Sequence, residues 1–294
     1  GSALFFGALR AGAGGVTWDG QVTLADTAVR LSALAAQTLT ITGAIVNGAG
    51  TGFNVSGQSG TGVVVVNPAV ANTYTGTSGV LRGILRLGKT DALPIGTTLD
   101  VDSVDNVTDV AIFDLAGFNQ TVAVLQDTAT LSLNGRITNS QAASTSTLRV
   151  NQGSNTAFDS VIENGAGTVV LTKGGSGNLT LNGVNTYTGG TNIENGKIIL
   201  GAGNDRLATT GSVVLGGVGT SGVLVLGDGT ARNQTLAGLT TTGNGGAVVG
   251  GAATAGTLTL NISSAQTFGG TLGGVGVNEN NLALTKTGAG TLTL

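Results

Sequence analysis

The segment LTKGGSGNLTLNGVNTYTGGTNIENGKIILG, residues Leu171–Gly201, decides the fold. Its run NLTLNG alternates apolar and polar residues, and this period of two is typical of a β-strand with one buried face. The same alternation occurs elsewhere in TLTITG, LSLNG and GTLTLNIS. Asn-Gly, Gly-Gly and Gly-Ser pairs bound these runs and allow the positive φ angles of tight turns. The sequence therefore predicts many short strands joined by turns.

Landmarks of this segment recur at a nearly constant distance. NTYTG occurs at Asn72–Gly76 and again 113 residues later at Asn185–Gly189. LTK occurs at Leu171–Lys173 and, also 113 residues later, at Leu284–Lys286. Such a fixed period is the signature of a repeat architecture. We predict one continuous domain over 1–294, with a divergent stretch at 1–40, repeat units at about 41–157 and 158–267, and a partial unit at 268–294.

Many short strands can build a sandwich, a barrel or a solenoid. Three features favour a β-solenoid: closely spaced turns rich in glycine, mainly Val, Leu, Ile and Ala at the apolar positions, and Thr and Asn at like positions of successive repeats, where they can stack as ladders. We therefore predict an all-β chain that forms a single elongated rod. One stretch, Leu24–Gln37, is left open as a short helix.

Composition excludes several classes of function. The chain has 53 glycines among 294 residues, 40% hydrophobic residues and only 9% charged ones, so it is not a disordered chain. It has no cysteine and no histidine, which rules out disulfides, thiolate metal sites and a Ser-His-Asp triad. The net charge is −3 without a basic stripe, so nucleic acid is not expected as a partner.

Targeting signals are not evident either. No apolar run approaches the roughly 20 residues of a membrane-spanning helix, so we expect no membrane-spanning segment. Gly1-Ser2 resembles a cloning remnant, and the complete lack of methionine indicates a processed product or an excised piece.

The octapeptide GILRLGKT, Gly83–Thr90, matches the phosphate-binding loop G-x-x-x-x-G-K-[ST]. Val110–Asp114 even resembles the magnesium-holding strand that accompanies it. A phosphate loop needs a helix that opens at Lys-Thr, whereas Pro94 follows four residues after Thr90. In the repeat alignment Gly88 falls on Gly201, so we interpret the motif as a strand-to-turn junction. GVGTSG at 217–222 matches G-x-G-x-x-G, a weak signal in so glycine-rich a chain.

The densest acidic patch is DVDSVDNVTD, at 100–109. Asp100, Asp102 and Asp105 are candidate calcium ligands, because carboxylate oxygens suit that ion. Paired carboxylates can also act as acid and base in glycoside cleavage. We favour a solvated acidic strand edge over both, and apart from calcium at this patch we expect no cofactor and no catalytic residue.

Tyr74 and Tyr187 occupy equivalent repeat positions. Exposed aromatics can stack on sugars, but recurrence in each unit favours a packing role. Trp18 is the single tryptophan, and we expect it to cover the first coils.

The segment Leu171–Gly201 strongly resembles the autotransporter-associated β-strand repeat, also called the passenger-associated transport repeat. The resemblance is carried by Leu171–Lys173, Leu179–Leu181, Asn185–Thr191 and the glycines between and after them. Leu284–Leu294 begins a second copy, and Val63–Gly88 is a degenerate one with Thr77 in place of a glycine. The resemblance implies a right-handed parallel β-helix in the exported region of a large bacterial surface or secreted protein. It supplies no catalytic residue.

We therefore expect a non-enzymatic structural or adhesive segment of an exported bacterial surface protein or extracellular fibre, located outside the cell or at its surface. The strand at Gly290–Leu294 lies within a repeat and resembles an open edge, which predicts continuation in a longer chain or end-to-end association into filaments. The alternatives are a carbohydrate- or host-binding module that recognises surface glycans, and a β-helix polysaccharide lyase or hydrolase.

Overall fold

The computed structural model describes residues 8–27, 29–57, 61–102, 110–128 and 134–294, and these residues form strands and turns without any helix. They divide into two compact units. The first comprises Gly1–Leu148, Asp159–Val161 and Gly165–Gly167, and the second Arg149–Phe158, Ile162–Asn164 and Thr168–Leu294. The predicted repeat boundaries stay predictions.

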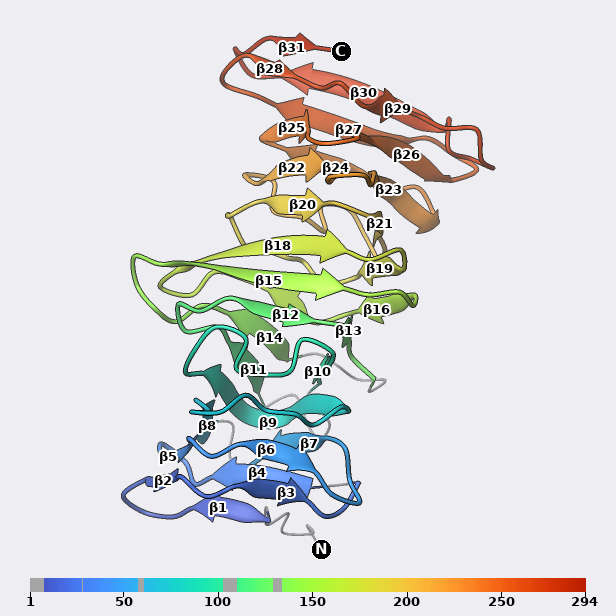
Figure 1. Ribbon diagram of the computed structural model, residues 1–294. Coiled ribbons are helices and arrows are strands. Elements are labelled where there is room, and N and C mark those ends of the chain that lie inside the picture. Colours follow the sequence, from blue (N-terminus) through green and yellow to red (C-terminus); the bar gives the residue numbers. More distant parts are fainter. Residues whose placement is uncertain (1–7, 28, 58–60, 103–109, 129–133) are drawn as a thin grey trace, which may run out of the picture. The chain divides into compact units, whose positions relative to one another are not determined.

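The first unit is a stack of short parallel strands (Figure 1). Its strands are Leu9–Ala11 (β1), Val16–Trp18 (β2), Val22–Leu24 (β3), Val29–Ala33 (β4), Thr38–Ile41 (β5), Ile45–Asn47 (β6), Phe53–Ser56 (β7), Val63–Val66 (β8), Thr77–Leu87 (β9), Thr98–Val101 (β10), Ala111–Asp114 (β11), Gln120–Val122 (β12), Val124–Gln126 (β13) and Gly135–Thr138 (β14). The order β1-β4-β7-β9 forms one parallel ladder and β2-β5-β8-β9 another. The long strand β9 bends through Gly83, at φ 100°, and so belongs to both.

The second unit is built in the same way. Its strands are Thr156–Phe158 (β16), Thr168–Gly174 (β18), Asn178–Leu181 (β19), Thr191–Ile193 (β20), Gly196–Leu200 (β21), Ser212–Leu215 (β22), Gly222–Gly229 (β23), Gln234–Leu236 (β24), Gly238–Thr241 (β25), Gly246–Ala252 (β26), Gly256–Asn261 (β27), Gln266–Thr267 (β28), Thr271–Leu272 (β29), Leu282–Thr287 (β30) and Leu292–Thr293 (β31); Thr145–Asn151 (β15) and Val161–Ile162 (β17) straddle the two units. The ladders β18-β20-β22-β25, β16-β19-β21-β23-β26-β29 and β24-β27-β30 form its walls. Each unit is thus a parallel β-solenoid, and the predicted solenoid fold is confirmed.

The core of each unit is a set of stacked aliphatic columns. Strand pairing places Leu179, Ile198, Leu224 and Val248 in register on four successive strands, and all four are fully buried. Burial of such a side chain stabilises the fold by about 1.5–3 kcal/mol. A single coil has no second layer to cover its apolar face, so each coil depends on its neighbours.

A column of glycines runs beside this core. Gly196, Gly222 and Gly246 are in register on β21, β23 and β26. A Cβ added at Gly222 would lie 1.8 Å from the carbonyl oxygen of Ile193, and one at Gly246 would lie 2.1 Å from that of Gly222. The backbones therefore approach too closely at this corner for any side chain.

Buried amide side chains connect the coils. Asn185 Oδ1 accepts a hydrogen bond from the backbone N–H of Ile162 at 2.7 Å, and its Nδ2 donates to the carbonyl of Arg206 at 2.8 Å. Asn72, 113 residues earlier, makes the same two bonds to the coils before and after it in the first unit. Both side chains are almost completely buried. The repeated Asn therefore joins three coils.

The tripeptide NQT, which occurs at Asn119–Thr121 and Asn233–Thr235, has an equivalent role. Gln120 and Gln234 are buried, and each accepts a hydrogen bond from the N–H of a leucine 27 residues earlier, Leu93 or Leu207, at 3.0 Å. Each also donates to the carbonyl of that same leucine. A polar tripeptide of this kind does not indicate from the sequence alone that its glutamine is internal.

The stretch Leu24–Gln37 contains strand β4, so the helix left open there is wrong. Val29, Leu31 and Ala33 alternate inward along β4, and Leu31 pairs with the buried Val55. Tertiary pairing overrides the helical propensity of the alanines and leucines.

Candidate functional site

The phosphate-loop motif does not form a phosphate-binding loop. Gly83 to Leu87 lie within β9, and the chain turns at Lys89 and Thr90 without starting a helix. Nζ of Lys89 donates to the carbonyl of Pro68 at 3.2 Å. The interpretation as a strand-to-turn junction is confirmed.

Asp114, at the end of the strand that resembled a magnesium-holding one, has a structural role. It is 1% exposed, and its Oδ2 lies 2.7 Å from Nε of Arg86 on β9. Its Oδ1 accepts hydrogen bonds from the backbone N–H groups of Ala116 and Ser140 at 2.9 and 3.0 Å. The carboxylate thus closes a turn and ties neighbouring coils together. GVGTSG likewise forms a tight turn, with an antiparallel bridge between Gly217 and Thr220.

The acidic patch is only partly described, since Asp105 lies outside the described residues. Asp100 and Asp102 are 7% and 1% exposed, so the preference for a solvated acidic edge is wrong for both. Asp100 Oδ2 accepts hydrogen bonds from Thr128 and Gln126, and within the described residues Oδ1 makes no hydrogen bond. Burial raises the pKa of Asp100, and the nearby Asp102 charge adds to the rise. Among the described residues no three acidic side chains gather at a metal site, and calcium at this patch stays a prediction.

The repeated tyrosines are packing residues. Tyr74 and Tyr187 are each 1% exposed, and their hydroxyls share hydrogen bonds of 2.6 Å with Ser78 and Thr191, each four residues later. The sugar-stacking alternative is therefore wrong for both. Trp18 on β2 pairs with Ile41 on β5 and stays 42% exposed.

The lysine of the LTK landmark is buried beneath a turn. Lys173 Nζ donates to the carbonyl oxygens of Gly174 at 2.5 Å and Gly175 at 2.9 Å, and reaches that of Asn195 on the next coil at 3.4 Å. Burial lowers the pKa of Lys173 to about 8. Lys286, at the equivalent position, donates to Gly288 at 2.7 Å but is exposed.

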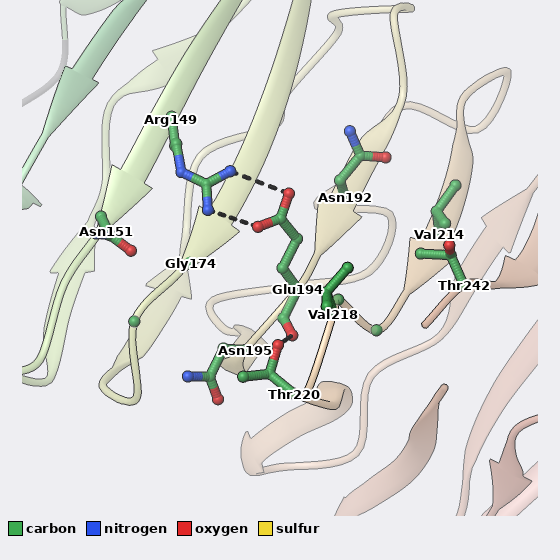
Figure 2. A pocket seen from close by; sticks show the side chains of 13 residues that line it. Arg149, Asn151, Gly174, Asn192, Glu194, Asn195, Val214, Val218, Thr220 and Thr242 are labelled. Atoms are coloured by element: carbon green, nitrogen blue, oxygen red, sulfur yellow. Dashed lines mark hydrogen bonds and ion pairs between the residues drawn. The ribbon is translucent and has the colours of Figure 1, made fainter. Parts of the chain in front are cut away.

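A polar groove borders that turn, and Gly174 and Gly175 of the turn line it. Its volume is about 710 Å³, and its lining residues are Arg149, Asn151, Gly174, Gly175, Asn192, Glu194, Asn195, Val214, Gly216, Gly217, Val218, Thr220 and Thr242, all in the second unit. At its centre Arg149 on β15 and Glu194, just after β20, form two hydrogen bonds of 3.0 and 2.5 Å (Figure 2). Thr220 fixes this arrangement by donating to the carbonyl of Glu194 at 2.7 Å.

Glycine makes room for the groove. A Cβ at Gly174 would lie 2.6 Å from Asn151 Oδ1 and 3.0 Å from a terminal nitrogen of Arg149. Sequence reasoning missed Arg149 and Glu194 because they stand 45 residues apart in unrelated motifs. Only knowledge of which strands stack would have brought them together.

The described residues include no helical segment with the length and apolar character of a membrane span.

Comparison with protein families identifies two segments of the chain. Residues 171–200 and 284–294 match the family described as Passenger-associated-transport-repeat. The family resemblance noted for Leu171–Gly201 and Leu284–Leu294 is therefore confirmed. The degenerate copy at Val63–Gly88 stays a prediction, although Asn72 and Tyr74 make the same contacts as their counterparts. Searches among curated proteins and among solved structures gave no match.

Proposed function

We propose, from the two passenger-associated transport repeats that the chain carries, that it is a non-catalytic structural segment of an exported bacterial surface protein or extracellular fibre. One observation carries this proposal: the characteristic side chains of the repeat hold coils together. Asn185 bonds to the coils before and after it, Tyr187 is buried against Thr191, and Lys173 binds the turn and the next coil. These residues build a scaffold and leave adhesive contacts to its outer surface.

Composition supports export as an unfolded chain. Charged residues are few and cysteine is lacking, so neither strong charge nor disulfides hinder passage through a membrane before folding. Folding outside then depends on coil-by-coil stacking.

The export role is tested by deleting residues 171–200 from the parent protein in its own bacterium. We expect a several-fold loss of protein at the cell surface, measured by protease treatment of intact cells, with transcript levels unchanged. Asn244→Ala, which alters one exposed side chain, serves as the control and leaves surface levels unchanged. Recovery of the unaltered protein in the cytoplasm would contradict the export role.

The non-catalytic role is tested by incubating the purified chain with polysaccharides. Cleavage of polysaccharides by the purified chain, lost on Asp102→Ala, would contradict the non-catalytic role.

We further propose that copies of this chain stack end to end, so that a coil of a second copy pairs with the exposed strand β30. Lys173 is buried where the next coil supplies the carbonyl of Asn195, whereas among the described residues Lys286 donates only to Gly288 on its own turn. Within the described residues β30 pairs with β27 along one edge, and the backbone groups of its other edge can accept a strand. Electron microscopy at high protein concentration is expected to show filaments that lengthen with concentration. Short particles dispersed at every concentration would refute this stacking.

A further inference from the structure

The groove around Arg149 and Glu194 presents hydrogen-bonding groups that the fold leaves unoccupied. Within the described part of the chain, the side chain of Asn151 makes no hydrogen bond, and neither does Oδ1 of Asn192 or Nδ2 of Asn195. The internal amide of Asn185, by contrast, bonds to three backbone groups. Asn192 Nδ2 also donates to Thr172 on the neighbouring strand, but all three groove amides keep hydrogen-bonding atoms that no other part of the described chain uses (Figure 2).

The ion pair in the groove is electrically balanced and half open. The side chains of Arg149 and Glu194 are 37% and 33% exposed. Two guanidinium nitrogens of Arg149 donate to the two carboxylate oxygens of Glu194. The guanidinium therefore keeps further N–H donors, and the carboxylate keeps further lone pairs. The pair consequently presents hydrogen-bond donors and acceptors next to each other, and its two opposite charges sum to zero.

The groove follows the direction in which strands stack. Its lining comes from β15, β18, β20, β22 and the end of β25, which are successive neighbours in one sheet. With strands about 4.8 Å apart, five of them extend over about 20 Å. The site therefore suits an elongated ligand with polar groups repeated along its length.

We propose that this groove binds an extended, neutral oligosaccharide. A sugar hydroxyl can both donate and accept a hydrogen bond. It therefore complements the exposed amides and the Arg149–Glu194 pair, which offer both donors and acceptors. Val214 and Val218 offer apolar contact to the C–H faces of the sugar rings. The volume of about 710 Å³ lies within the range of about 300–1,000 Å³ usual for small-molecule sites.

An added peptide strand fits this surface less well. Peptides commonly bind by extending a free sheet edge, but β20 at the groove is already paired on both sides, with β18 and β22. The proposal goes beyond the structural role and does not depend on export.

The test uses calorimetric titration of the whole chain with malto-, cello-, manno- and chitohexaose, and with oligogalacturonate as an acidic comparison. We expect at least one neutral hexasaccharide to bind. Asn151→Ala should weaken its binding about fivefold, since one hydrogen bond contributes about 1 kcal/mol. Asn151 is exposed and makes no bond within the described chain, so this variant should fold normally. Arg149→Ala should weaken binding more than Asn151→Ala does.

Lys197→Gln is the matched control, because it breaks a surface ion pair with Glu279 outside the groove. It should leave binding unchanged. Three results would each overturn the proposal: no heat from any neutral hexasaccharide, equal binding by Asn151→Ala and the unaltered chain, or a preference for oligogalacturonate. Surface localisation is measured separately, so failure here leaves the export role standing.

Discussion

Gly222→Ala is expected to destabilise the second unit by about 3 kcal/mol or more. The added Cβ would lie 1.8 Å from the carbonyl oxygen of Ile193 and 2.5 Å from its carbonyl carbon. Backbone atoms cannot move aside as a flexible side chain can, and overpacking a tight site typically costs about 1–3 kcal/mol, occasionally more. Urea denaturation measures the loss. Hydrogen exchange should show it first in β21 and β23, which pair at Gly222.

Gly153→Ala provides the matched control within the same unit. Nothing lies within 4 Å of a Cβ built there, and the backbone does not require glycine. This substitution should be neutral or should stabilise by about 0.4–1 kcal/mol, because alanine restricts the unfolded chain. If both variants lost stability equally, the effect would be a general one of replacing glycine, and the steric account of the glycine column would be wrong.

The glycine column also shows why glycine is so frequent in this chain. Gly196 has a positive φ of 66°, but Gly222 and Gly246 lack the positive φ that usually explains glycine, and a Cβ at either would lie within 2.1 Å of a backbone oxygen. Close stacking of successive coils, as well as turn geometry, therefore demands glycine at these positions.

Features that depend on recurrence could be predicted from the sequence. The alternation in NLTLNG gives strand β19 with its inward leucines, and the repeated NTYTG predicted equivalent, packed tyrosines. Periodicity indicates which residues share an environment. It therefore predicted that Asn72 and Asn185 occupy equivalent positions, and both accept a hydrogen bond from a backbone N–H of the preceding coil.

Features that depend on which coils stack could not be predicted. Asp100 and Asp102 resemble an open acidic edge in the sequence, but Asp100 lies on β10, which pairs with both β9 and β13. The groove has the same origin, because Arg149 and Glu194 meet only through the order β15-β18-β20. A local pattern does not encode register between distant strands.

The second large effect is expected from Asn185→Ala, at about 3 kcal/mol. The substitution leaves the N–H of Ile162 and the carbonyls of Gly183 and Arg206 without the side chain that binds them. An unsatisfied buried polar group costs about 1–3 kcal/mol, and the N–H of Ile162 and the carbonyl of Gly183 are both affected, while the carbonyl of Arg206 still accepts from the backbone N–H of residue 185. Urea denaturation of the whole chain measures the difference. Asn244→Ala, at an exposed turn, should change stability by less than about 0.5 kcal/mol.

Asn185→Asp separates the acceptor from the donor role of this side chain. Aspartate can still accept from Ile162, but its charge faces the carbonyls of Gly183 and Arg206. Burial and these carbonyls should raise its pKa in the folded chain above the unfolded value of about 3.9. The folded state then binds more protons than the unfolded state between these two pKa values, so the stability of this variant should fall as pH rises through that window. If Asn185→Asp and the unaltered chain showed the same pH dependence there, Asn185 would not donate to these carbonyls.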